Sequence, residues 1–175
     1  RILKLMNRKH TVEFYFSIFE KLKKINKNIE FSSDFIVGYP EETEKDFKET
    51  LSLIEKIDFI NSYSFIYSPR PGTVAAKKET ISKNIMDKRL KIIQGILSKK
   101  QIKKNQSLEG KIVEVLVENV MKDKVKLFGR NQYMSPVIFD GDSENIGKIV
   151  QVQINSSNNN SLFGKLLNKQ NKKVA

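Results

Sequence analysis

Arg70 is the residue whose setting most directly suggests chemistry, because it stands between two prolines in SFIYSPRPGT, residues 64–73. Each proline ring restricts the backbone, so the guanidinium is held in a narrow range of directions at a small cost in conformational entropy. A guanidinium is a planar fork that pairs with a carboxylate or a phosphate. A rigid surface turn with an incidental arginine is the plainer interpretation, but the position of this turn after an apolar run favours a binding role.

A second candidate site lies in SDFIVGYPEET, residues 33–43. Gly38 allows a backbone to approach a ligand closely, and Asp34 lies near the end of the same apolar run. With Glu42, these residues are candidates for the rim of a site for a cationic or hydroxyl-rich cofactor. Acidic residues at the start of a helix also stabilise its dipole, and this is the better explanation for the glutamates of this stretch taken alone.

Basic and aromatic side chains in the second half of the chain indicate a nucleic-acid surface. The stretch FGRNQY contains Phe128, Arg130 and Tyr133, and Lys126 precedes it. On a β-barrel, such side chains stack on RNA bases and clamp them. A place in the core is the better interpretation for Phe128, whereas Arg130 and Lys126 are predicted to bind RNA. Residues 83–104 hold eight Lys or Arg against one acid, although a solvated helix face explains most of these lysines singly.

The spacing of apolar residues predicts the elements that must position these side chains over residues 11–67. Their alternation implies βα units with a parallel sheet, in which the loops after the C-terminal strand ends build the active site. Both candidate loops follow predicted strands. The predicted elements are a helix over 11–27 capped by Thr11, a strand over 35–37, a helix capped by Thr43 with Asp46 as its capping-box partner, and a strand over 58–67. The predicted inward stripes are Tyr15, Ile18, Leu22 and Ile25 in the first helix, and Phe47, Leu51 and Ile54 in the second.

The pattern changes near residue 106. Ser82 can cap a helix to about Lys104, with an inward stripe of Met86, Leu90, Ile93 and Leu97. Beyond it, five short strands, several alternating with period two, predict a small β-barrel. The predicted fold class is therefore α/β, the C-terminal part of a partial (βα) barrel followed by a small all-β barrel. The predicted divisions are 1–105, 106–168 and a flexible tail over 169–175.

Composition limits the classes of function. The 175 residues carry a formal charge of +12, which favours a polyanion such as nucleic acid, although a lysine-rich proteome would explain it equally. There is no cysteine and one histidine, His10, so disulfides and cysteine-ligated metals are excluded within these residues. No stretch is long and apolar enough to span a membrane. The chain opens inside a helical pattern, and we expect it to be the C-terminal part of a longer protein.

Taken together, these segments resemble the C-terminal portion of the MiaB-type tRNA methylthiotransferases, which are radical S-adenosylmethionine (SAM) enzymes. The resemblance rests on four motifs in order, RILKLMNRKHT, SSDFIVGYPEETEKDF, YSFIYSPRPGTVAA and FGRN, and covers nearly the whole chain. It implies that residues 1–105 form the last βα units of a radical-SAM partial barrel. It also implies that residues 106–168 form a TRAM domain, a small β-barrel that binds tRNA.

The resemblance implies an enzyme that adds a methylthio group to N6-isopentenyladenosine next to the anticodon, with SAM and two 4Fe-4S clusters as cofactors. The cluster ligands are expected outside this chain, which alone would be inactive and bind no metal. Asp34, Gly38 and Glu42 are expected near SAM, Arg70 on the substrate side, where a tRNA phosphate or the SAM carboxylate could lie, and Arg130 with Lys126 on the tRNA. The expected partner is the tRNA anticodon stem-loop, and the protein is expected to be a cytoplasmic monomer without membrane contact.

Two departures and three alternatives accompany this resemblance. The cluster cysteines are absent, and Glu41 stands where the family pattern has Gly. A relative that modifies a ribosomal protein is expected to carry an acidic residue in its PRPGT-like loop, so Arg70 favours tRNA. A relative that acts on threonylcarbamoyl-adenosine in tRNA stays open because of SSDFIVG, and so does a non-catalytic RNA-binding module. An upstream reading frame with CxxxCxxC would decide between enzyme and module.

Overall fold

The computed structural model describes residues 1–122 and 125–167. The chain divides into two compact units, Arg1–Lys100 and Gln101–Ala175. The predicted boundary near residue 106 coincides with the last residue of helix α4, a few residues beyond this division. The predicted tail over 169–175 lies outside the described residues.

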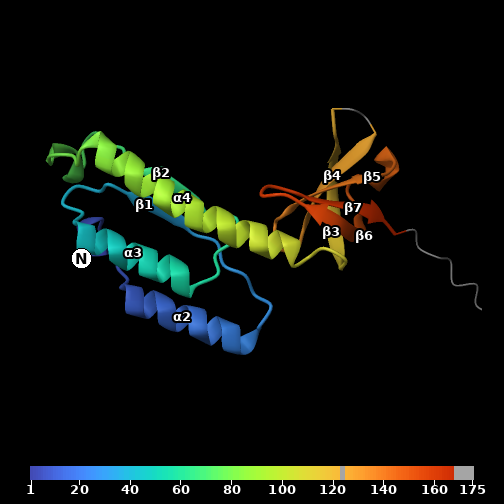
Figure 1. The fold of residues 1–175 in the computed structure, drawn as a ribbon, viewed down its shortest axis with the longest axis horizontal. Coiled ribbons are helices and arrows are strands. Elements are labelled where there is room, and N and C mark those ends of the chain that lie inside the picture. Colours follow the sequence, from blue (N-terminus) through green and yellow to red (C-terminus); the bar gives the residue numbers. More distant parts are fainter. Residues whose placement is uncertain (123–124, 168–175) are drawn as a thin grey trace, which may run out of the picture. The chain divides into compact units, whose positions relative to one another are not determined.

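The first unit is built on a two-stranded parallel sheet, β1–β2, whose register runs from Asp34 opposite Tyr63 to Val37 opposite Ile66. Helices α3 and α4 run side by side over one face of this sheet (Figure 1). The predicted parallel arrangement is therefore confirmed. The elements are α1 (Ile2–Leu5), α2 (Val12–Ile25), β1 (Asp34–Val37), α3 (Glu44–Lys56), β2 (Tyr63–Ile66), η1 (Ala75–Lys77) and α4 (Lys83–Gln106).

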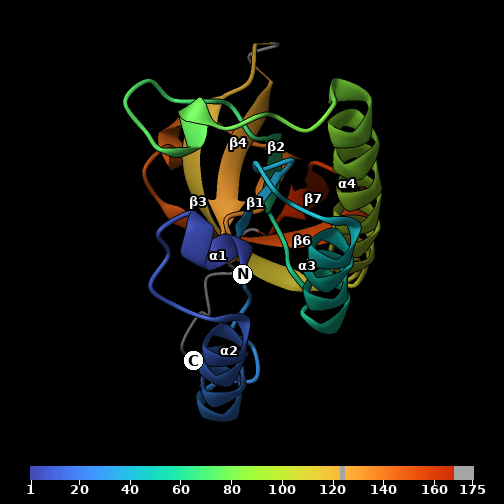
Figure 2. The same ribbon diagram turned by 90° about the vertical axis from the view of Figure 1, so that its left-hand side faces the viewer.

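Two helices begin where the sequence predicts, for local reasons. The Thr11 hydroxyl accepts a hydrogen bond from the backbone N–H of Phe14. At α3, Thr43 and Asp46 form a reciprocal capping box, in which each side chain accepts from the other residue's backbone N–H. Such caps satisfy donors that the first turn of a helix leaves unpaired. Segment 67–82, green in Figure 2, then forms a long arch before α4 begins.

The core of the first unit confirms two of the three predicted helix stripes. Phe47 and Ile54 of α3 and Ile93 and Leu97 of α4 are buried. The prediction for α2 is wrong in part, because Ile18 and Ile25 are exposed, whereas Phe16 and Phe19 pack on the core beside Tyr15. An aromatic ring buries more apolar area than a branched aliphatic chain, and three of the four rings of α2 pack on the core, while Phe14 is exposed. None of the helices in the described part of the chain combines the length and apolar character needed to cross a bilayer.

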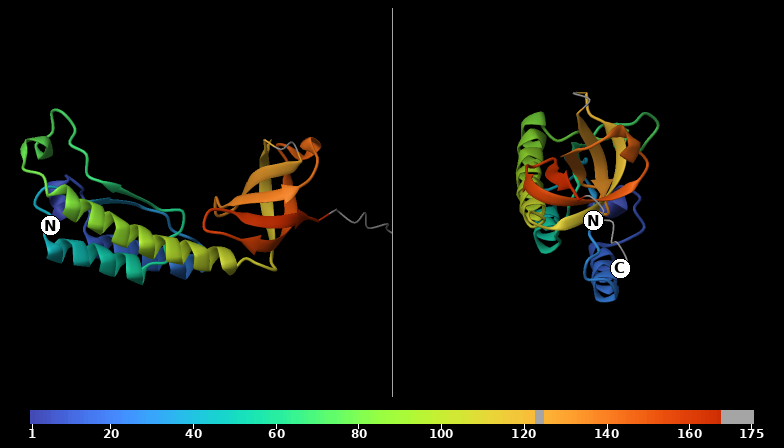
Figure 3. Two further views of the ribbon diagram at one scale, coloured as in Figure 1. Left: turned by 45° about the horizontal axis from the view of Figure 1, so that its top comes forward. Right: turned by 90° about the vertical axis from the view of Figure 1, so that its right-hand side faces the viewer.

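The second unit is a closed five-stranded barrel in the order β3-β4-β5-β7-β6 (Figure 3). Neighbouring strands are antiparallel except β5 and β7, which are parallel. The predicted small β-barrel is thus confirmed. Its strands are β3 (Ile112–Val120), β4 (Lys126–Asn131), β5 (Pro136–Asp140), β6 (Ile149–Ser157) and β7 (Leu162–Leu166), with the short η2 (Ser143–Asn145) before β6. Its core consists of Leu108, Val113, Val115, Val117, Leu127, Val137, Phe139, Val152, Ile154 and Leu162.

Two glycines allow the barrel strands to approach each other closely. A Cβ added to Gly129 would lie 2.3 Å from the carbonyl oxygen of Leu116, and one added to Gly164 would lie 2.4 Å from that of Gln153. Both obstacles are backbone atoms, which cannot move aside as a flexible side chain would. A side chain at either position would therefore force neighbouring strands apart.

Candidate functional site

The two loops singled out in the sequence meet at one edge of the β1–β2 sheet. The backbone N–H of Tyr67 donates to the carbonyl of Val37 over 2.8 Å. Beyond it, the rings of Tyr39 and Tyr67 meet edge to face with centroids 5.0 Å apart. Because the strands are parallel, their carboxyl ends lie at the same edge. The expectation that both loops leave one edge of a sheet is confirmed.

Gly38 has a left-handed backbone, with φ of 74°, a conformation that favours glycine. The space where its side chain would stand is filled, since an added Cβ would lie 2.4 Å from Cγ of Met86 in α4. Its N–H donates to Oε2 of Glu42 over 2.9 Å. The tight backbone approach that the sequence suggested at Gly38 is thus made to a helix of the same unit.

Glu42 is buried and paired with Arg89 of α4. Nη1 of Arg89 lies 2.6 Å from Oε2 of Glu42 and also donates to the Glu42 carbonyl over 3.2 Å. Nη2 reaches the carboxylate of Glu44 at 3.3 Å, and the guanidinium lies 5.2 Å from the ring centroid of Phe47. The carboxylate of Glu42 is therefore engaged inside the protein.

Arg89 is the residue of this site that sequence reasoning missed, because it was counted among the basic residues of 83–104 and not singled out. Only 6% of its surface is exposed. A usable signal was present, since position 89 lies three residues after Met86 and four before Ile93. It therefore falls on the stripe that faces the core.

The turn after Gly38 is also tied to distant parts of the unit by ionic contacts. Glu41 pairs with Lys78, and its carbonyl accepts from Nη2 of Arg1 over 2.5 Å. Arg1 also pairs with Asp46, and its hydrogen bonds lower the pKa of that carboxyl well below its ordinary value. The φ of Glu41 is 69°, which agrees with the expectation of Gly at this position, because the left-handed region costs a residue with a Cβ about 1–2 kcal/mol.

Asp34 and Arg70 are not brought together. Asp34 is the exposed first residue of β1, so the expectation that it lies near the loop end of the strand is wrong. Four residues of strand separate it from Gly38 by roughly 13 Å. Arg70 is exposed in the turn after β2, where its carbonyl accepts hydrogen bonds from Thr73. Within residues 1–122 and 125–167, its side chain makes no ion pair or hydrogen bond, so the guanidinium faces solvent.

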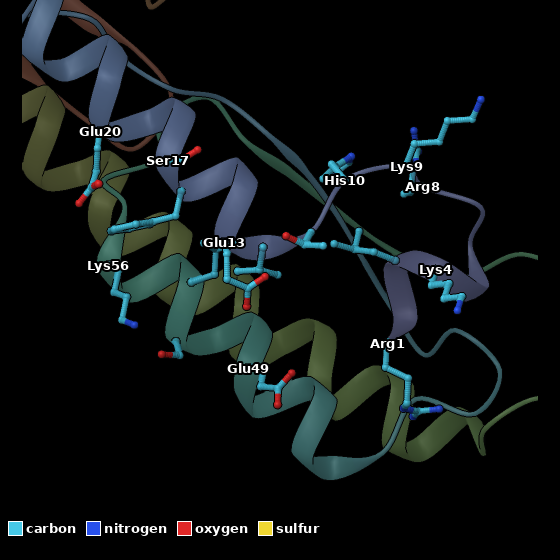
Figure 4. A pocket seen from close by; sticks show the side chains of 16 residues that line it. Arg1, Lys4, Arg8, Lys9, His10, Glu13, Ser17, Glu20, Glu49 and Lys56 are labelled. Carbon is cyan, nitrogen blue, oxygen red and sulfur yellow. The ribbon is translucent and has the colours of Figure 1, made fainter.

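A pocket of about 820 Å³ opens among α1, α2 and α3. Figure 4 shows Glu13 on α2, Glu49 on α3, and Arg8 and Lys9 on the connecting loop among the residues that line this pocket. Its lining mixes both signs of charge and includes none of the predicted site residues. Among the described residues, no three His, Cys, Asp or Glu side chains are grouped as a metal site would require.

On the barrel, Lys126, Phe128 and Arg130 lie on the outer face of β4, because their alternate neighbours point into the core. The core assignment of Phe128 is therefore wrong. Its ring is half-buried beneath the guanidinium of Arg130, at 5.3 Å from the centroid. Tyr133 carries Nζ of Lys104 at 4.6 Å from its ring centroid. Phe128 and Arg130 therefore lie on the outer face of the barrel, and Tyr133 is partly exposed.

Comparison with known proteins adds two domain matches. The family model of the TRAM domain matches residues 106–167, and that of the Radical SAM superfamily matches residues 1–54. Among the similar proteins are three that carry the name tRNA-2-methylthio-N(6)-dimethylallyladenosine synthase. That of Pelagibacter ubique is 66% identical over 100% of this chain and 39% of its own length. Those of Wolbachia pipientis from Culex pipiens and of Erythrobacter litoralis are 46% and 42% identical, over 94% and 95% of this chain and 38% and 37% of their own lengths. The chain therefore spans less than two fifths of the length of these relatives.

Proposed function

We propose that this chain, which matches the radical SAM superfamily over residues 1–54 and the TRAM domain over residues 106–167, belongs to a MiaB-type tRNA methylthiotransferase. Such an enzyme adds a methylthio group to N6-dimethylallyladenosine, the isopentenylated adenosine beside the anticodon. The 66% identity to the Pelagibacter ubique synthase along the whole chain carries this proposal. The names of the relatives favour the dimethylallyl substrate over threonylcarbamoyl-adenosine.

We assign part of a SAM site to this chain, but no part of an iron–sulfur cluster site. Without cysteine, its residues do not fit a 4Fe-4S cluster, and the clusters would be held by residues that this chain does not contain. When bound, SAM would supply the radical chemistry of the reaction. We assign this chain's share of the SAM site to the end of β1 at Gly38, where Glu42 positions the backbone by accepting the Gly38 N–H and does not itself contact the cofactor. Asp34 begins β1 and has no part in this assignment.

We assign the contact with tRNA to two surfaces. The barrel supplies Arg130 and Lys126, and the exposed guanidinium of Arg70 serves the substrate at the sheet edge. The anticodon stem-loop is the part of tRNA that carries the modified adenosine, so it is the proposed ligand. A tRNA-modifying role implies action in the cytoplasm. One copy of the chain suffices for these contacts, and light scattering tests the expected monomer.

The test is fluorescence anisotropy with a labelled anticodon stem-loop at several salt concentrations. Phosphate contacts release counterions, so raising salt from about 50 to 200 mM should weaken binding on the order of a hundredfold or more. An affinity independent of salt would exclude the electrostatic mechanism. If heparin competes as well as tRNA, only a general affinity for polyanions remains.

A non-catalytic RNA-binding module is the second candidate, because the closed barrel is complete here while cluster ligands are absent. The upstream reading frame separates the two. Three cysteines at CxxxCxxC spacing would support the enzyme, and a frame without them would support the module.

A further inference from the structure

Arg130 and Phe128 form a layered pair on the outer face of the barrel. Residues two apart on a strand share a face, and the guanidinium carbon of Arg130 lies 5.3 Å from the ring centroid of Phe128. Such cation–π contacts hold the guanidinium plane over the ring. One face of the guanidinium is thereby supported, and the Arg130 side chain keeps 38% of its surface exposed.

Glu118 of β3 fixes this guanidinium from the side. Its Oε2 lies 2.5 Å from Nη1 of Arg130. The contact depends on a bulge in β3, since Val117 pairs with Gly129 and Asn119 with Phe128, which leaves Glu118 as the extra residue. An extra residue re-aims the side chains around it. Arg130 is consequently oriented and paired with a carboxylate before any ligand arrives.

Three aliphatic side chains lie around this pair on the outer face of the barrel. Leu116 lies opposite Arg130 in the β3–β4 register and is 45% exposed. Ile149 lies opposite Leu116 on β6 and is 68% exposed. Ile138 of β5 lies beside Phe128 in the same way. A flat guanidinium beside exposed aliphatic side chains matches the flat, weakly polar face of a nucleobase.

A phosphate fits this place less well. To bind a phosphate through its free donors, Arg130 must either leave Glu118 or bring the phosphate close to that carboxylate, and like charges at short range repel. A base makes no such demand, because stacking uses the open face of the guanidinium while its edge stays on Glu118. Arginine planes and aromatic rings are the surfaces on which unpaired RNA bases stack.

We propose that an unpaired RNA base stacks on the Arg130 guanidinium, with Phe128 beneath it and Glu118 holding its edge. This inference rests on the proposed function, because it names what the barrel contacts in the RNA. It makes Arg130 a base-binding residue whose contribution depends little on salt. Phosphate contacts then come from other cations.

The test compares two RNA probes, an anticodon stem-loop with its unpaired bases and a fully paired RNA duplex of equal charge. Arg130→Lys keeps the charge and loses the plane, and Phe128→Leu keeps an apolar side chain and loses the ring. Each should weaken stem-loop binding about tenfold, as expected for one stacked base, by the same factor at each salt concentration. Duplex binding should stay unchanged. The exposed Lys148 provides the control, because Lys148→Ala should affect both probes alike if it affects either.

Glu118→Gln gives the opposite signature. Without its carboxylate partner, Arg130 is released to bind a phosphate, so the salt dependence of stem-loop binding should steepen by about one charge equivalent. Thermal unfolding checks that each variant keeps its fold.

Three results would overturn the inference. If Arg130→Lys binds the stem-loop like the wild type, stacking is not the contact. If Arg130→Ala weakens both probes and reduces the salt slope by about one, Arg130 is a phosphate ligand. If the wild type binds no RNA at low salt, the proposed function fails as well, whereas the first two results leave it intact.

Discussion

The guanidinium of Arg89 lies 2.6 Å from the carboxylate of Glu42, with both side chains buried. The two residues are 47 positions apart in the chain and join α4 to the turn after β1. The same carboxylate accepts the N–H of Gly38. The backbone at the end of β1 is thus held by a charge pair that is shielded from solvent.

Arg89→Ala should lower the free energy of unfolding by about 3–5 kcal/mol, because it leaves the carboxylate of Glu42 buried without its partner. Lys88→Ala is the matched control, since Lys88 is exposed on the same helix, and its effect should stay within about 0.5 kcal/mol. Urea unfolding followed by circular dichroism measures both. Equal stability of the two variants would contradict a structural role for the pair.

Glu41→Gly should be more stable than Glu41→Ala by about 1 kcal/mol, because φ at this position is 69° and only glycine adopts it without strain. Both variants lose the contact with Lys78, so their difference isolates the backbone cost. Thermal unfolding provides the comparison. If alanine is as stable as glycine, the left-handed conformation is not present in solution.

The Asp46 carboxyl should make the stability of the fold depend on pH in the acidic range. Its folded-state pKa is depressed, first by the hydrogen bonds from Arg1 and then by Thr43. A carboxyl whose pKa is lower in the folded state stabilises the fold at pH values above its unfolded pKa of about 3.9. This stabilisation is lost as the pH falls from there towards the folded-state pKa. Asp46→Asn should therefore flatten the fall of Tm between about pH 5 and pH 2. The exposed Glu79 supplies the control, since Glu79→Gln should follow the wild-type curve.

Gly129→Ala should destabilise the barrel by about 1–3 kcal/mol or prevent its folding, because the new methyl group meets the Leu116 carbonyl oxygen. Gly95→Ala makes the same chemical change on an exposed face of α4, where nothing lies within 4 Å. It should stabilise the helix by about 1 kcal/mol. Equal effects of the two substitutions on chemical unfolding would show that strand approach at Gly129 is less close than described.

Much of the fold follows from local sequence. The capping box of Thr43 and Asp46 joins residues three apart, and the period-two alternation of β3 separates core from surface within that strand. Such signals need no knowledge of distant contacts, since a helix cap or a strand pattern is complete within a few residues. The resemblance to a tRNA-modifying family rests on motifs of the same short length.

Only the tertiary structure determined which charged residues are buried and paired inside the protein. Arg89 and Glu42 look like surface residues in sequence, yet α4 packs against the turn after β1 and buries both. Phe128 has the composition of a core residue, yet the register of the closed barrel turns it outward beneath Arg130. The physical reason is common to both: burial and ion pairing depend on groups far apart in the chain, and only the folded backbone brings those groups within a few ångströms of each other.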